Sequence, residues 1–171
     1  ADMLHSHFGN TLAVKSRYPA MKKWVEYTMK ASMVDSILVK DTYGDWCMPP
    51  ESEKLIHSKD PSRITSAPVL STTVFYDILN KMQGFAKLAG CPEDAAKYAA
   101  DAANIRKAFN AKYFDTKNGS YDNNTVTANL LALRLGLVPE EYKDRLVENI
   151  VDKTKDVWNS HVSGGVLGIQ H

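Results

Sequence analysis

Two stretches decide the fold: Gly90-Cys91-Pro92-Glu93-Asp94 and Gly136-Leu137-Val138-Pro139-Glu140-Glu141. In each, a glycine supplies the left-handed residue that commonly closes a helix, and a proline followed by acidic residues opens the next helix. The two glycines are 46 residues apart (136 − 90). This spacing predicts a repeated helical hairpin, with one helix ending and another beginning at each stretch.

Working outward from these stretches, the sequence predicts two kinds of helix. The segment from about Val69 to Ala89 has a broad apolar face, and Thr125 to Leu135 is apolar on most sides, which is typical of a buried helix. The segment from Pro92 to Tyr113 or Phe114 has a narrower apolar stripe. Further helices are expected from Pro19 to about Ser32, after Pro139, and at Val166–Ile169, where a sixth helix starts.

Amphipathic and strongly apolar helices therefore alternate along the chain. No segment shows the alternation of apolar and polar residues over a length that would predict a β-strand instead of a helix. Two concentric layers explain this alternation, with outer helices exposed to solvent on one side and inner helices buried on most sides. The predicted fold class is all-α, a partial α/α toroid. Six hairpins at the observed spacing need roughly 280 residues, of which this chain supplies about half. Residues 1–171 are accordingly expected to form a single domain that is a fragment of a larger catalytic domain.

Composition excludes several classes of function. The 171 residues include 21 Lys and Arg against 20 Asp and Glu, a formal charge of +1 that gives no electrostatic case for nucleic acid. No apolar run approaches the length of a membrane span. The two cysteines make neither a disulfide framework nor a zinc site. Asp115, Asp122 and Asn123 lack the ligand spacing of a calcium loop and predict a turn, so neither metal nor cofactor is expected.

A long irregular stretch from about Ile37 to Pro68 contains Tyr43-Gly44-Asp45-Trp46. Irregular segments of this length are usually functional or disordered. A carboxylate that accepts hydroxyl hydrogen bonds, next to a flat apolar indole, suits a sugar ring. The alternative is that Asp45 caps a backbone amide and Trp46 packs in the core.

Four stretches in order resemble the catalytic domain of the α-L-rhamnosidases, family 78 of the glycoside hydrolases. Residues 18–27 are similar to its helix of the type Y-P-S-M-K-x-W-x-x-Y, and residues 43–46 resemble its G-D-W loop. Residues 127–133 are similar to its T-A-x-A-L-A-L inner helix, and residues 161–168 resemble its H-L-T-T-G-x-x-G turn. Val126 and Gly164 depart from the family pattern, which leaves fine substrate choice open.

The resemblance implies an inverting hydrolase that removes terminal α-L-rhamnose from glycosides or polysaccharides. The family's general acid lies upstream of the G-D-W loop and its base lies downstream of the H-x-x-x-G turn. Neither motif is in this sequence, so no catalytic residue is assigned and the chain alone is expected to be inactive. The substrate-binding residues that the resemblance implies are Asp45, Trp46 and His161, with a structural role as the alternative for each.

The resemblance also favours a periplasmic or extracellular parent protein over a cytoplasmic one. Half a ring would leave inner helices without neighbours, so self-association of the isolated chain is expected. Two other functions remain open from the residues. One is a different α/α-toroid glycosidase, and the other is a non-catalytic helical-repeat module that binds a protein partner.

Overall fold

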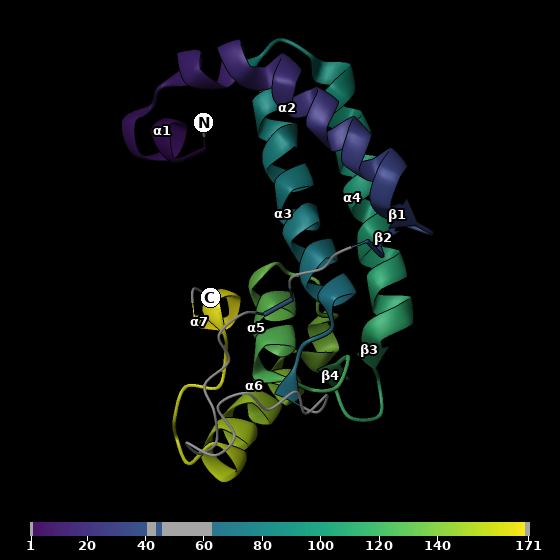
Figure 1. Ribbon diagram of the computed structural model, residues 1–171, viewed down its shortest axis with the longest axis vertical. Helices are drawn as coiled ribbons and strands as arrows, with labels where there is room; N and C mark the ends of the chain where they lie inside the picture. Colours follow the sequence, from purple (N-terminus) through teal and green to yellow (C-terminus); the bar gives the residue numbers. More distant parts are fainter. Residues whose placement is uncertain (1, 41–43, 46–62, 170–171) are drawn as a thin grey trace.

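The computed structural model of the protein describes residues 2–40, 44–45 and 63–169. Most of these residues lie in helices, and the longest three run for 22 residues each (Figure 1). The described strands are two residues long, so the predicted all-α class is confirmed. In chain order the elements are α1 (Asp2–Phe8), α2 (Thr11–Ser32), β1 (Met33–Val34), β2 (Ile37–Leu38), α3 (Ala67–Leu88), α4 (Pro92–Tyr113), β3 (Phe114–Asp115), β4 (Ser120–Tyr121), α5 (Val126–Arg134), η3 (Glu140–Tyr142), α6 (Lys143–Asp152), η4 (Lys153–Val157) and α7 (Val166–Ile169).

The helices form two rows. Helices α3, α5 and α7 are neighbours in space, since α5 packs against both α3 and α7. Helices α2 and α4 pack on α3, and α6 packs on α5, so these three form the other row. The inner row is the more apolar one: α5 buries six of its nine residues, whereas α6 buries only Leu146. The predicted alternation of outer and inner helices is confirmed.

Tight glycine turns lead from each inner helix to the next outer helix. Gly90 follows α3 with φ of +77°, and Gly136 follows α5 with φ of +67°. The amide after each glycine bonds back to a carbonyl of the preceding helix, Cys91 to Ala86 at 2.8 Å and Leu137 to Ala132 at 2.9 Å. This pattern is the Schellman closure that a left-handed glycine permits. Both predicted stop-and-start stretches therefore have the expected geometry.

Longer connections lead from each outer helix to the next inner one, and two of them begin with a short antiparallel hairpin. Strands β1 and β2 pair Met33 with Leu38, and β3 and β4 pair Phe114 with Tyr121. The turn of the first hairpin places Asp35 and Ser36 at positive φ, as in a type I′ turn. The sequence did not reveal these hairpins, because a two-residue strand is too short to show alternation.

The first long helix begins earlier than its predicted start at Pro19. Helix α2 starts at Thr11, because the Asn10 side chain accepts hydrogen bonds from the amides of Leu12 and Ala13 at 3.0 and 3.2 Å. Pro19 lies inside the helix, where its ring removes one backbone donor. The prediction of this boundary was wrong, since proline marks a helix start only where no stronger cap lies upstream.

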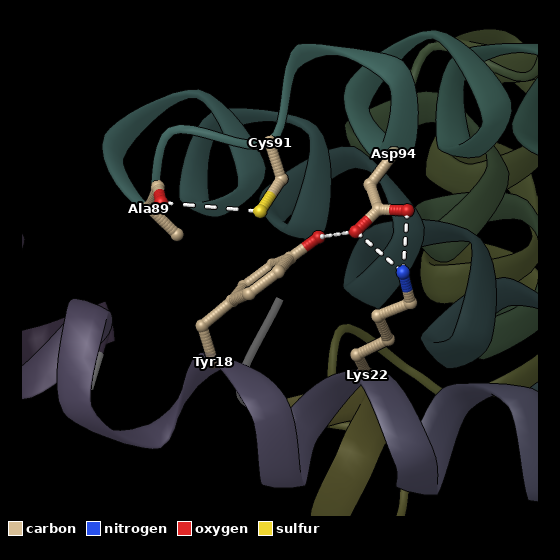
Figure 2. Close-up of polar contacts among 5 residues, drawn as sticks. All are labelled: Tyr18, Lys22, Ala89, Cys91 and Asp94. Atoms are coloured by element: carbon tan, nitrogen blue, oxygen red, sulfur yellow. Dashed lines mark hydrogen bonds and ion pairs between the residues drawn. The ribbon is translucent and has the colours of Figure 1, made fainter.

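A polar clamp ties α2 to the first turn of α4. The Tyr18 hydroxyl donates to Oδ2 of Asp94 at 2.7 Å, and Lys22 Nζ reaches the two carboxylate oxygens at 2.6 and 2.8 Å (Figure 2). The Lys22 hydrogen bond, followed by that of Tyr18, lowers the pKa of Asp94. Burial, followed by the bond to Asp94, raises the pKa of Tyr18. Two residues of the 18–27 motif thus serve helix packing.

Candidate functional site

The inner helices α3, α5 and α7 begin close together, on the side where the longer connections arrive. The hydroxyl oxygens of Thr65, before α3, and Thr125, at the N-cap of α5, are 2.5 Å apart. The amide of Ser66 donates to Oδ2 of Asp122 at 3.1 Å. Side chains of the longer connections therefore stabilise this side of the inner helices, whereas glycine turns close the opposite side.

Asp45 lies at the centre of this end and is 7% exposed. Its Oδ2 accepts from the Thr127 hydroxyl of α5 at 2.7 Å and from the amide of Gly165 at 2.9 Å. Its Oδ1 accepts from the amide of Leu167, in the first turn of α7, at 3.1 Å. These are the contacts of the capping alternative, in which the carboxylate satisfies free amides at a helix start. Sugar binding by Asp45 stays a prediction.

Two glycines allow α7 to approach this carboxylate closely. A Cβ on Gly164 would lie 2.8 Å from the backbone carbonyl carbon and Cα of Gly168, and a Cβ on Gly168 would overlap the Thr127 hydroxyl. Neither glycine has a positive φ, so close approach of the backbone, rather than a left-handed turn, explains both glycines. Gly44, before Asp45, has φ of +67°, a left-handed conformation that glycine adopts without strain.

A hollow of about 390 Å³ lies between α2, α3 and the start of α7, and Asp45 is not among the described residues that line it. Two lining residues are neighbours of Asp45: Gly44 precedes it in the chain, and the amide of Leu167 donates to its Oδ1. A mixture of apolar walls and a few hydroxyl and ammonium groups is typical of sites for small polar ligands. The lining residues from the other elements are Trp24, Thr28, Ser32, Leu38, Lys40, Leu70, Ser71, Val74, Phe75 and Ile78.

His161 is exposed in the loop before α7, and its Nδ1 lies 3.0 Å from the carbonyl oxygen of Trp158. None of the hydrogen bonds to the Asp45 carboxylate comes from His161. The ring of Trp158 in the same loop lies under the guanidinium of Arg63, from the segment before α3, at 4.8 Å from the ring centroid, which is the geometry of a cation–π contact. A role for His161 in sugar binding stays a prediction.

Other candidates from the sequence fall elsewhere. Trp46 lies outside the described residues. Asp115 accepts from the amides of Lys117 and Asn118, so the predicted turn is confirmed there. In residues 2–40, 44–45 and 63–169, no group of acidic, His and Cys side chains has the arrangement of a metal site.

Sequence reasoning missed Thr127 as a partner of Asp45, because the two residues are 82 positions apart. A signal was present in the spacing of Gly164 and Gly168, four residues apart, which marks a face where a backbone packs closely. A threonine in the first turn of a largely apolar helix is the matching signal on α5.

Comparisons with known proteins identify the fold. A model of the bacterial alpha-L-rhamnosidase six-hairpin glycosidase domain matches residues 1–171. The chain belongs to this family. The predicted resemblance is thereby confirmed, and the two rows of helices are an arc of the six-hairpin ring.

Relatives of the family cover nearly all of this chain. The chain is 28% identical to an alpha-L-rhamnosidase of Formosa agariphila over 167 residues, which are 95% of this chain and 17% of that protein. It is 29% identical to an alpha-L-rhamnosidase of Alteromonas sp. (strain LOR) over 170 residues, 96% of this chain and 18% of that protein. The chain thus spans less than a fifth of the length of these rhamnosidases.

Solved structures agree with this assignment. The alpha-L-rhamnosidase from Dictyoglumus thermophilum superposes with a TM-score of 0.81 at 28% identity, covering 94% of this chain and 18% of the other. The Streptomyces avermitilis alpha-L-rhamnosidase complexed with L-rhamnose gives a TM-score of 0.78 at 25% identity, covering 94% of this chain and 14% of the other.

None of the helices in the described part of the chain combines the length and the apolar character that a membrane span requires.

Proposed function

We propose that this chain is an arc of the catalytic domain of an inverting α-L-rhamnosidase, which removes terminal α-L-rhamnose from glycosides or polysaccharides. The observation that carries the proposal is the match of the rhamnosidase six-hairpin domain to residues 1–171. Superposition on a rhamnosidase complexed with L-rhamnose supports the same substrate class. In this proposal residues 1–171 are one structural unit, and the rest of the ring comes from other parts of the protein.

The arc supplies sugar-binding groups rather than the reacting carboxylates. Asp45 accepts a hydrogen bond from a sugar hydroxyl, and Trp46 offers a flat apolar face to the sugar ring. His161 contacts the sugar from the loop before α7, in the central cavity of the ring. Inversion needs an acid and a base roughly 6.5–9.5 Å apart, with room for a water molecule. The family motifs that carry those two groups are absent from residues 1–171, so the chain alone does not hydrolyse rhamnosides.

Made by itself, the chain associates with other copies. Between α2 and α3 lies an apolar groove of about 540 Å³, and Trp24 on its wall is 50% exposed. In a closed ring such a groove receives a neighbouring helix, whereas in isolation its exposure drives association. Groove residues from the two helices include Met21, Val25, Ile78, Met82 and Phe85.

The test is hydrolysis by the full-length protein of p-nitrophenyl glycosides, with α-L-rhamnoside compared against β-D-glucoside and α-L-arabinofuranoside. The proposal predicts turnover of the rhamnoside alone, with NMR showing the inverted anomer as first product. Turnover of another glycoside in its place would favour a different α/α-toroid glycosidase. Residues 1–171 alone should give no turnover, and sedimentation should show oligomers rather than a stable monomer.

A further inference from the structure

We propose that helix α1 continues upstream of Asp2 in the full-length protein as the inner helix of a preceding hairpin, and that this continuation docks into the trough between α2 and α3. The inference rests on the part of the proposed function in which the rest of the ring comes from the same protein. It adds which segment covers this face, in which direction that segment runs, and how long it is.

The turn after α1 is of the kind that follows an inner helix. Gly9 has φ of +63°, and the amide of Asn10 bonds back to the carbonyl of Leu4 at 3.1 Å. Asn10 then caps the outer helix α2. Left-handed glycines likewise connect α3 to α4 and α5 to α6. The order of elements therefore places α1 in the inner row, as about the last two turns of an inner helix.

An ion pair sets the level of α1 against its neighbour α3. Oδ2 of Asp2 lies 3.2 Å from Nζ of Lys81. Asp2 is six residues before the end of α1 (8 − 2), and Lys81 is seven residues before the end of α3 (88 − 81). Because glycine turns close the same side of each hairpin, neighbouring inner helices are parallel. Upstream of Asp2 the chain therefore runs along α3 toward the start of that helix.

The trough along this path is open and largely apolar. Two hollows of about 540 and 390 Å³ lie against α2 and α3, and they adjoin because Trp24 and Ile78 line both of them. Asp2 lines the larger hollow, so α1 already points into the trough. Trp24 is 50% exposed and Val74 is 38% exposed. The α3 side of the trough is a stripe of residues three or four positions apart, which are Ser71, Val74, Ile78, Met82 and Phe85.

The dimensions and charges of the trough describe its occupant. Helix α3 extends 14 residues before Lys81 (81 − 67), so a parallel helix needs about 14 residues before Asp2 and is about 21 Å longer than α1. Its face toward the trough must be apolar at spacings of three and four residues, as packing between two helices requires. Lys40 lines the second hollow, so an acidic residue in the first turn of the new helix is favoured by that ammonium group and by the helix dipole.

The experiment uses Val74→Cys in the full-length protein, with Ala103→Cys as the matched control. Both positions lie inside a 22-residue helix and are exposed in residues 1–171, but Ala103 is on the solvent side of α4, away from the trough. The first readout is the rate at which maleimide alkylates each cysteine in the native protein, measured by mass spectrometry. The second replaces Val74 with the photo-crosslinking amino acid p-benzoylphenylalanine and identifies the crosslinked peptide. Thr28, on the α2 side of the trough, is the second position for this amino acid if the first variant unfolds.

We expect Val74→Cys to react at least about 100-fold more slowly than Ala103→Cys at every protein concentration, because alkylation requires the docked helix to open. The crosslink should join position 74 to a peptide within about 14 residues before Asp2. Equal alkylation rates would overturn the inference. So would a crosslinked dimer, which assigns this face to a second copy, or slow alkylation without a crosslink to that segment. Absence of rhamnoside cleavage refutes the proposed activity and changes neither readout, so the two failures are distinguishable.

Discussion

Replacing Gly168 by alanine should loosen the start of α7. The new Cβ would overlap the Thr127 hydroxyl and would lie 3.3 Å from the Thr127 Cβ and 3.4 Å from Oδ2 of Asp45. Relief requires Thr127 to turn away, which breaks its 2.7 Å bond to the carboxylate. Losing a hydrogen bond to a charged group costs about 1.5–3 kcal/mol, and the better helix propensity of alanine returns at most about 1 kcal/mol. The net loss is about 0.5–2 kcal/mol when the full propensity gain is subtracted.

The assay is amide hydrogen exchange by mass spectrometry on the full-length protein, read on peptides that cover residues 163–169. Local opening should become about 2- to 30-fold more frequent, because each 1.4 kcal/mol is a factor of ten. Gly84→Ala is the matched control, since Gly84 is an exposed helical glycine with nothing within 4 Å of its Cβ position. That variant should leave exchange at 163–169 unchanged.

A double-mutant cycle tests the contact between Thr127 and Gly168 directly. Thr127→Ala removes the oxygen that the new Cβ meets, so Gly168→Ala should cost much less in that background than in the wild type. The expected coupling is about 1–2 kcal/mol, within the range for residues in contact. Strictly additive effects, or unchanged protection of 163–169 in Gly168→Ala, would show that Thr127 and Gly168 do not meet as the structure describes.

Four further outcomes are expected. Removing the Tyr18 hydroxyl (Tyr18→Phe) should cost about 1–2 kcal/mol of stability, measured by chemical unfolding. The pKa of Asp94 in the folded protein is lowered from 3.8, so its clamp stabilises the fold above that pH and is lost as the pH falls through the lower folded pKa. Asp94→Asn should therefore make the melting temperature depend less on pH below about 4. Phe109→Ala should cost about 3–5 kcal/mol through the cavity it leaves, which thermal melting reports. Asn129→Leu should cost about 1–3 kcal/mol, since the buried amide of Tyr121 then loses its 2.9 Å acceptor, and exchange at that amide checks it.

The helix boundaries that the sequence predicted well are those governed by local chemistry. Helix α4 begins at Pro92 and ends at Tyr113, as expected, because proline, acids and a left-handed glycine act within a few residues. The start of α2 was missed because the Asn10 cap competes with the Pro19 signal nine residues later. Two local rules disagreed there, and sequence alone does not rank them.

The candidate site was predicted only in part, because its contacts join distant positions. The loop of Asp45 was recognised from its own composition. The partners of the carboxylate lie 82 residues away at Thr127 and 120 residues away at Gly165, and no local pattern links them. The same distance explains why capping of α7 and sugar binding could not be separated from the sequence. The structure adds a distinction between the two oxygens of one carboxylate, which only geometry supplies.

A crystal structure of the full-length protein with L-rhamnose tests the central claim most directly. The inner helices should border the sugar on the side where α3, α5 and α7 begin, with one sugar hydroxyl within hydrogen-bond distance of the Asp45 carboxylate. Rhamnose seated at the opposite end, beside the glycine turns at Gly90 and Gly136, with Asp45 making only its three bonds to the protein, would contradict it.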